Sequence, residues 1–199
     1  MESKNKNYRT KTEIAKERAL IKSAQKDKEN FGKLYELHYP IIFGYIRKRI
    51  ENREIAEDLA SKTFEKALNA IESFQWQGVS FRAWLFRIAR NVLNDYFRAA
   101  GRRPKDVSWE AIAPIIKDKG LRPEEVALRD DDEMALYELM AELDNQEQYL
   151  LYYKFFENLT NVEISKITGL SETNVGTKLY RIRNKMKEKL SIEIGDENL

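Results

Sequence analysis

SFRAWLFRIARNVLNDYFRAAGRR, Ser80 to Arg103, is the stretch of this chain that decides the fold. At 100° per residue, its pattern predicts one long helix with an apolar face made of Phe81, Leu85, Ile88, Val92 and Ala99. The opposite face carries Phe86, Arg87, Arg90, Asn94 and Phe97. From residue 81 to residue 103 six arginines stand against one aspartate, a charge of +5.

Basic residues interleaved with exposed aromatic residues are typical of a site for single-stranded nucleic acid. Cations bind phosphates, and ring faces support unstacked bases. The pattern alone leaves one alternative open, a core helix whose basic face is simply solvated.

The composition favours a folded, helical protein. Hydrophobic residues make up 42% of the chain and charged residues 34%, with only eight Gly and four Pro. The absence of Cys excludes disulfides, thiolate zinc sites, iron–sulfur clusters and cysteine nucleophiles. No apolar run is long enough to span a membrane, and the polar N-terminus has no signal core. We therefore expect a cytoplasmic protein without membrane insertion.

The charge is distributed unevenly along the chain, although the net charge is only +2. Residues 104–149 hold thirteen acidic and five basic side chains, a charge of −8, and residues 172–190 carry +4. The order basic, acidic, basic predicts two separate nucleic acid contacts joined by an acidic segment.

Helical periodicity dominates, so the predicted fold class is all-α, with two helical domains joined by an acidic linker. In the first domain we expect helices over about 12–26, 29–39, 40–50 and 53–71, with Pro40 opening the third and Asn52 capping the fourth. The predicted organisation is a flexible N-terminus (1–12), a first domain (13–103), a linker (104–130), a second domain (131–192) and a tail (193–199).

The second domain contains NVEISKITGLSETNVGTKLYRIRNKM, residues 161–186, a short helix, a turn around Gly169 and a longer basic helix. Thr160 with Glu163 forms a capping box before the first of these helices, and Asp144 with Glu147 forms another further upstream. This pattern predicts a helix-turn-helix whose second helix reads a DNA major groove. An ordinary helical hairpin is the alternative.

The predicted recognition helix has a buried stripe of Val175, Leu179, Ile182, Met186 and Leu190. Its other face carries Thr173 and Asn184, with Thr177, Tyr180 and Arg181 assigned to base edges and Lys178, Arg183 and Lys185 to phosphates. In residues 53–71 the polar stripe Asp58, Ser61, Lys62, Glu65 and Asn69 is mixed in sign. This stripe is either a solvated face or a docking face for a protein.

Together these segments resemble a bacterial sigma factor of the sigma-70 family, in its extracytoplasmic-function (ECF) group. AEDLASKTFEKAL (56–68) followed by SFRAWLFRIARN (80–91) is similar to the region 2 signature. FFENLTNVEISKITGLSETNVGTKLYRIRNKMKEKL (155–190) is similar to the region 4 helix-turn-helix.

The resemblance implies a transcription initiation factor that binds core RNA polymerase and promoter DNA. Region 2 would melt the −10 element and hold a flipped base, with Trp76 as a stacking platform. The −10 residues it implies are Trp76, Arg82, Arg87, Arg90, Asn91, Asn94 and Arg98. The −35 element would be read by the recognition helix. The helix with Asp58, Leu59, Ser61, Lys62 and Glu65 would dock on the β′ clamp helices, and the β flap is a further polymerase contact.

The chain departs from the family pattern at several positions. Ser61-Lys62 replaces Gln-Glu, Leu143-Asp144 replaces Leu-Pro, and Gly176 stands where Lys or Arg is usual. The resemblance also allows an anti-sigma factor as a partner and implies no cofactor.

Two other classes of function compete with a sigma factor. An enzyme is disfavoured because His38 is the single histidine and no phosphate-binding glycine loop completes a site. A free-standing helix-turn-helix regulator would explain the second domain but not the basic aromatic helix of the first.

Overall fold

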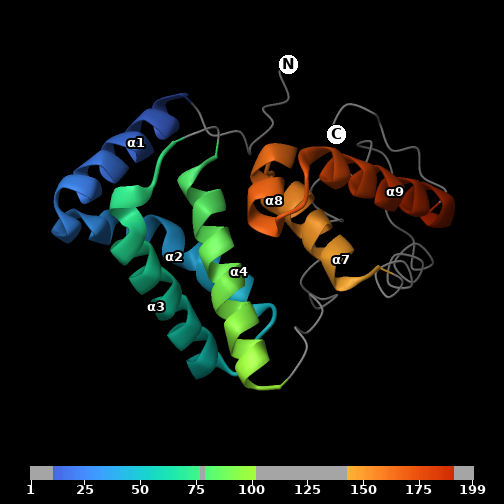
Figure 1. Cartoon of the computed structure of the whole chain (residues 1–199), viewed down its shortest axis with the longest axis horizontal. Coiled ribbons are helices and arrows are strands. Elements are labelled where there is room, and N and C mark those ends of the chain that lie inside the picture. The colour runs from blue at the N-terminus through green and yellow to red at the C-terminus, as the bar shows by residue number, and fades with distance from the viewer. Residues whose placement is uncertain (1–10, 77–78, 102–142, 191–199) are drawn as a thin grey trace, which may run out of the picture.

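The structure is a computed structural model that describes residues 11–76, 79–101 and 143–190. The described residues are helical and contain no strand, so the all-α prediction is confirmed. An N-terminal unit contains α1 (Lys11–Lys26), η1 (Lys28–Phe31), α2 (Gly32–Arg47), α3 (Arg53–Ala70), η2 (Ile71–Ser73) and α4 (Phe81–Ala99). A C-terminal unit contains α7 (Asn145–Leu151), a π-helical turn (Tyr152–Phe156), α8 (Asn161–Thr168) and α9 (Glu172–Leu190). Figure 1 shows α8 lying beside α4, so the two units are in contact.

The predicted helix starts are confirmed where the sequence supplies a capping side chain. Asn52 accepts a hydrogen bond from the Ile55 amide at 3.0 Å, and Ser80 accepts one from the Ala83 amide at 3.2 Å. Both predicted capping boxes form, at Asp144 with Glu147 and at Thr160 with Glu163. Each cap satisfies backbone N–H groups that the helix itself leaves without a partner.

The prediction of two helices separated at Pro40 is wrong. A single helix, α2, runs through this proline. Its buried stripe includes Leu34, His38 and Ile42 and therefore continues across Pro40 without a change of face. Pro40 and Glu36 are exposed, so the Glu36 carbonyl that loses its helical partner lies on the water side. Core packing on the other face keeps the helix continuous.

The helix α4 is shorter than the sequence indicated. It ends at Ala99, and Gly101 follows with a φ of 62°, a conformation that favours glycine and ends helices. Phe81, Leu85 and Val92 are buried as predicted, whereas Ile88 is half-buried and Ala99 is exposed. Arg102 and Arg103 lie outside the described residues.

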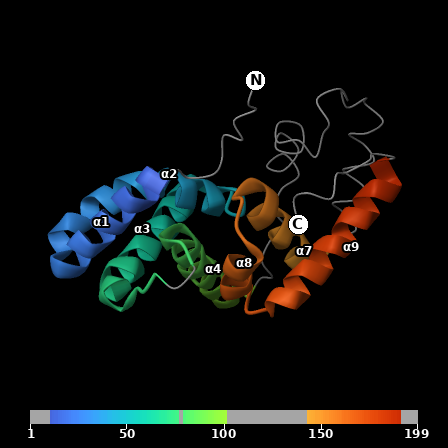
Figure 2. The same cartoon turned by 90° about the horizontal axis from the view of Figure 1, so that it is seen from above.

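The helix α1 is held to the rest of the N-terminal unit by apolar and polar contacts. Ile21 and Ala24 are buried, and the carboxylate of Glu17 forms a buried pair with His38 of α2 at 2.9 Å. Viewed from above, α1 lies at one end of the molecule and α9 at the other (Figure 2). The neighbours of His38 in the sequence, Tyr39 and Pro40, predicted a packed residue at the end of a helix. His38 is indeed packed, but it lies in the interior of α2.

Candidate nucleic-acid interface

The helices α8 and α9 form the helix-turn-helix that the sequence predicted. Gly169 ends α8 in the left-handed conformation (φ 79°), and Ser171 caps α9 by accepting the Asn174 amide at 3.2 Å. Ile164 and Ile167 of α8 are buried, and so are Val175, Leu179 and Ile182 of α9. The side chains of Met186 and Leu190 lie outside those that the structure describes.

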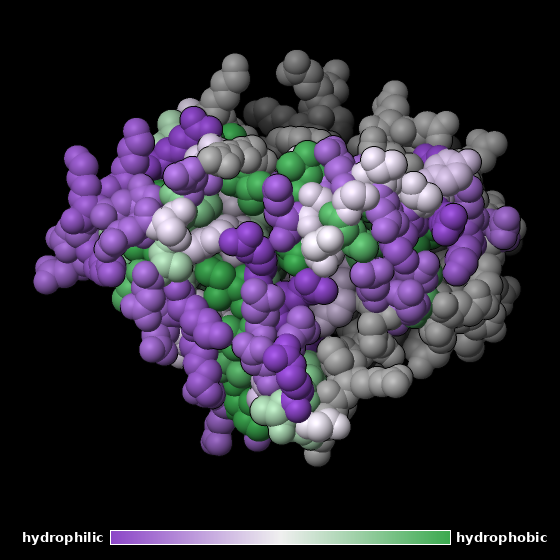
Figure 3. Space-filling view, in the orientation of Figure 1, coloured by the Kyte–Doolittle hydropathy of each residue, from purple (hydrophilic) through white to green (hydrophobic). Residues whose placement is uncertain are grey.

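The opposite face of α9 is open to solvent, as Figure 3 shows by the hydrophilic side chains along this helix. Tyr180 is 51% exposed, and the Arg183 guanidinium lies 5.2 Å from the centre of its ring. The other predicted −35 residues also lie away from the core, with Thr173, Thr177 and Arg181 exposed and Lys178 and Asn184 half-buried. This face of α9 is therefore open to a partner such as a DNA duplex in this arrangement.

The aromatic residues on the basic face of α4 are buried, which corrects the prediction that they are exposed. Phe86 is 0% and Phe97 4% exposed. The Phe86 ring contacts Tyr45 of α2 and Tyr153 of the C-terminal unit, with ring centres 5.1 and 5.8 Å apart. The periodicity of α4 could not show this, because the covering side chains come from a distant part of the chain. Phe86 and Phe97 are core residues, not base-stacking platforms.

The predicted −10 residues of α4 fall into two groups. Arg82 forms an ion pair with Glu157, whose side chain is buried, and Arg90 donates a hydrogen bond to the Ile167 carbonyl at 2.8 Å. Both partners belong to the C-terminal unit. The second group lies on the open side of the helix, where Arg87, Asn91 and Arg98 are exposed and Asn94 is half-buried.

Glu163 joins the starts of two helices from different units. One carboxylate oxygen accepts the Thr160 amide at 3.0 Å within the α8 capping box, and the other accepts the Ser80 amide at 3.0 Å, at the cap of α4. The carboxylate thus satisfies backbone donors on both sides of the junction. The capping box is visible in the sequence, whereas its second contact is not.

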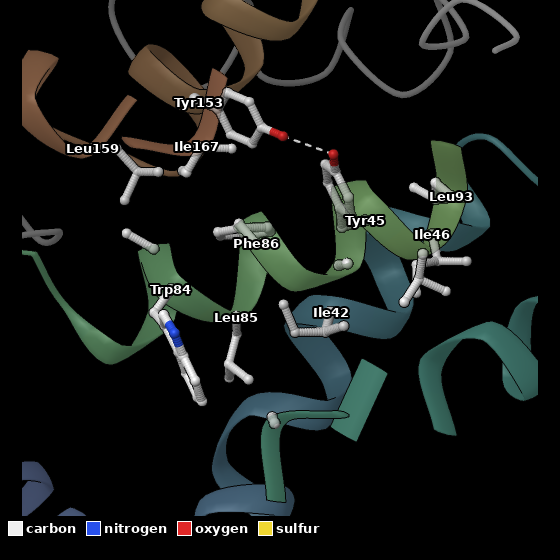
Figure 4. Close-up of a cluster of buried hydrophobic side chains, with 14 of the residues drawn as sticks. Ile42, Tyr45, Ile46, Trp84, Leu85, Phe86, Leu93, Tyr153, Leu159 and Ile167 are labelled. Carbon is white, nitrogen blue, oxygen red and sulfur yellow. Dashed lines mark hydrogen bonds between the residues drawn. The ribbon is translucent and has the colours of Figure 1, made fainter. Parts of the chain in front are cut away.

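A second set of contacts at the junction surrounds Arg49, a buried cation just after α2. Its guanidinium lies 3.9 Å from the ring centre of Tyr45, 4.5 Å from that of Tyr149 and 5.1 Å from that of Tyr152. The hydroxyls of Tyr45 and Tyr153 form a hydrogen bond of 2.7 Å. Figure 4 draws this bond as a dashed line. Burial raises the pKa of Tyr45 to about 12, so this pair is uncharged at neutral pH.

Lys48, next to Arg49, lies at the junction in surroundings that favour its uncharged form. Its ammonium lies 4.8 Å from the centre of the Tyr152 ring. Burial, together with the neighbouring Arg49 charge, lowers the pKa of Lys48 to about 7. No signal in the sequence distinguished Lys48 and Arg49 from the other basic residues.

The polar stripe of α3 lies on the surface. Asp58, Ser61, Lys62 and Glu65 are exposed, and Lys62 forms an ion pair with Asp58 at 2.7 Å. Leu59 is only 3% exposed, so its side chain belongs to the core and not to the stripe. The mixed charge makes this a poor surface for nucleic acid, and its exposure fits both a solvated face and a docking face for a protein.

Trp76, the predicted stacking platform, is half-buried and lies beside α1. The Arg18 guanidinium is 4.7 Å from the centre of its ring. Phe74 packs against Phe81 and Trp84, with ring centres 5.3 and 5.1 Å apart. Residues 77 and 78 of the predicted loop lie outside the described residues.

In the parts of the chain that the structure describes, no cluster of His, Asp or Glu side chains has the composition to hold a metal ion. None of the described helices is both long and apolar enough to cross a membrane.

Both halves of this chain are similar in sequence to known protein families. The model for sigma-70 region 2 matches residues 34–103, and the model for sigma-70 region 4 matches residues 133–186. The chain is 31% identical over 180 residues to the RNA polymerase sigma factor YlaC of Bacillus subtilis, covering 87% of this chain and 99% of YlaC. It is 31% identical over 163 residues to the ECF RNA polymerase sigma factor BldN of Streptomyces coelicolor, covering 81% of this chain and 61% of BldN.

Two solved structures have a similar fold. CnrH, in complex with the cytosolic domain of CnrY, matches with a TM-score of 0.57 at 22% identity, covering 88% of this chain and 97% of CnrH. The sigma factor RpoE of Bartonella quintana, in complex with the anti-sigma factor NepR, matches with a TM-score of 0.53 at 21% identity, covering 83% and 99%.

The chain belongs to the sigma-70 family of RNA polymerase sigma factors, in its ECF group. It is therefore a transcription initiation factor that binds core RNA polymerase and promoter DNA, and not a free-standing helix-turn-helix regulator.

Proposed function

We propose that three surfaces of this sigma factor divide the work of initiation. The open face of α9 reads the −35 element, with Thr177, Tyr180 and Arg181 at base edges. The face of α4 and the neighbouring Trp76 open the −10 element and hold a flipped base. The polar stripe of α3 docks on the clamp helices of the polymerase β′ subunit.

The observation that carries this proposal is the exposure of α9. Its apolar side packs on α7 and α8, and the cations and hydrogen-bonding side chains of its other side reach solvent. A helix held in this way in a helix-turn-helix enters the major groove, where Arg, Thr and Tyr side chains reach base edges.

The two units are in contact in this structure, and the spacing of the promoter elements requires them to separate on the promoter. The −35 and −10 positions are about 25 base pairs apart, or roughly 85 Å along the DNA axis. The helices α4 and α9 have 19 residues each, a length of about 28 Å. Two units in direct contact cannot reach both elements, so the contacts of Arg82 and Arg90 must break before α4 meets the −10 element.

We also propose a cellular location and a further partner for the chain. RpoE, which shares the fold, was solved with an anti-sigma factor. A cytoplasmic location and an anti-sigma partner therefore form part of the proposal, as does a function in binding without catalysis.

The test is reconstitution with purified bacterial core RNA polymerase, followed by run-off transcription on a library of genomic fragments. We expect stable binding to the polymerase and selective initiation that yields a promoter motif. Tight binding of the chain alone to duplex DNA, with no binding to polymerase, would contradict the proposal.

Arg181→Ala tests the −35 assignment on a promoter recovered from that library. Loss of a base contact is expected to cost about 1–3 kcal/mol of binding and to relax sequence preference at the contacted position. Competition between duplexes that differ at single −35 positions measures both effects. Binding to core polymerase should not change, and a variant that loses it would show that α9 serves the polymerase and not the DNA.

A further inference from the structure

The helix α1 reaches the segment between α3 and α4 at several points. It lies before the region 2 match, which begins at residue 34. The Gln25 amide donates hydrogen bonds to the carbonyls of Ile71 and Phe74, at 3.1 and 2.7 Å. Ile71 is the first residue of the short turn η2 and Phe74 directly follows it, so a single side chain fixes the path of the backbone where it leaves α3.

A second contact connects α1 to Trp76, the residue proposed above as the platform on which a flipped base stacks. Arg18 stands two turns before Gln25 on the same helix, and its guanidinium lies over the Trp76 ring at 4.7 Å. Arg18 is exposed, whereas Trp76 is half-buried. A guanidinium on an aromatic ring is attracted to it and keeps its remaining N–H groups free to bind phosphate.

The rest of the helix is anchored in the core. Ile21 and Ala24 are buried between the two contacts, and Glu17 pairs with His38 of α2. Because α1 cannot shift without breaking this packing, Arg18 and Gln25 are presented to the loop from a rigid element. This arrangement is typical of side chains that position a binding site.

We propose that α1 is a working part of the −10 site. Gln25 is a positioning residue that fixes the start of the loop, and Arg18 supplies a cation beside the base that stacks on Trp76. This inference rests on the proposed role of Trp76 and adds two residues to it.

The experiment uses holoenzyme assembled with each variant on a promoter recovered by the run-off selection. Permanganate reactivity of unpaired thymines measures the rate of opening, and binding at several salt concentrations counts the phosphates contacted. The variants are Arg18→Ala, Arg18→Lys, Gln25→Glu and Trp76→Ala. Lys16→Ala, which removes an exposed charge elsewhere on α1, is the matched control.

We expect Arg18→Ala to slow opening about fivefold or more and to lower the salt slope by about one, whereas Lys16→Ala behaves as the parent. Arg18→Lys keeps the charge and should therefore keep the same dependence of binding on salt concentration. Gln25→Glu has the same shape but no N–H donor, and should relax the preference among the four bases at the captured position. A merely structural role for Gln25 would lower the melting temperature without changing that preference.

Two other results separate the inference from the function on which it rests. In the first result, Arg18→Ala and Gln25→Glu show normal promoter opening, salt dependence and base preference, whereas Trp76→Ala opens the promoter more slowly. This result would overturn the role of α1 and leave the −10 assignment standing. Normal opening with Trp76→Ala would overturn both, because the platform itself would then be wrong.

Discussion

The two basic helices, α4 and α9, differ in what covers them, although both have 19 residues. The polar face of α9 reaches solvent, whereas the basic face of α4 is partly covered by α8 and the π turn before it. Phe86 and Tyr180 illustrate the contrast, at 0% and 51% exposure. The sequence of a helix shows which residues share a face, and only the tertiary structure shows what lies on that face.

The sharpest test of this comparison is a matched pair of aromatic substitutions. Phe86→Ala should cost about 3–5 kcal/mol of unfolding free energy, because the ring is fully buried. Tyr180→Ala should change it by no more than about 0.5 kcal/mol, since the side chain is exposed. Denaturant unfolding monitored by circular dichroism measures both. A Phe86→Ala variant that keeps its stability but fails to open the promoter would restore the stacking role predicted from sequence.

The next largest effect is expected at the ion pair across the junction. Arg82→Ala leaves the Glu157 carboxylate buried without this cation, at a cost of about 3 kcal/mol to the contact between the units. The chain has no native cysteine, so dyes on cysteines introduced at Asn69 and Glu172 would report the separation of the units by energy transfer. Arg87→Ala, an exposed charge on the same helix, is the control. Unchanged transfer in Arg82→Ala would mean that the ion pair does not hold the units together.

A smaller effect is expected in the pH dependence of the equilibrium between the units in contact and the units separated. The pKa of Lys48 is lowered from 10.5 to about 7 in this arrangement, and it should rise again when Tyr152 moves away. Between pH 7 and 10.5 the separated state then binds more protons, so raising the pH through this range favours the contact and lowering it favours separation. Below about pH 7 this dependence ends. The same energy-transfer pair should show the trend, and Lys48→Met should abolish it; a trend that persists in Lys48→Met would come from another group.

The smallest effect concerns α9 alone. A Cβ at Gly176 would meet the Asn161 side-chain nitrogen at 3.7 Å, an ordinary contact, so alanine fits without strain. Gly176→Ala should therefore stabilise the chain by about 0.5–1 kcal/mol through helix propensity. A rise in the melting temperature, with unchanged −35 preference, is the expected result. A fall would show that α9 needs the glycine for closer packing than the structure shows.

Local signals fixed much of this protein in advance. These signals act between side chains a few residues apart. They include the caps at Asn52, Ser80 and Thr160, the glycine that ends α8, and the members of the apolar stripes that are buried, namely Phe81, Leu85 and Val92 in α4 and Val175, Leu179 and Ile182 in α9. Such interactions are set by helical geometry alone, and they sufficed to predict the all-α class and the helix-turn-helix.

The tertiary structure decided whatever depends on partners distant in the chain. Pro40 stays inside α2 because packing on the opposite face outweighs the loss of one hydrogen bond. Phe86 is buried because Tyr45 and Tyr153, 108 residues apart, meet over it. Contacts between the two units are made by Arg82, Arg90 and Glu163. Contacts between α1 and the segment that follows α3 are made by Arg18 and Gln25. Periodicity describes one helix at a time, whereas burial and charge pairing are properties of the surfaces that two helices bring together.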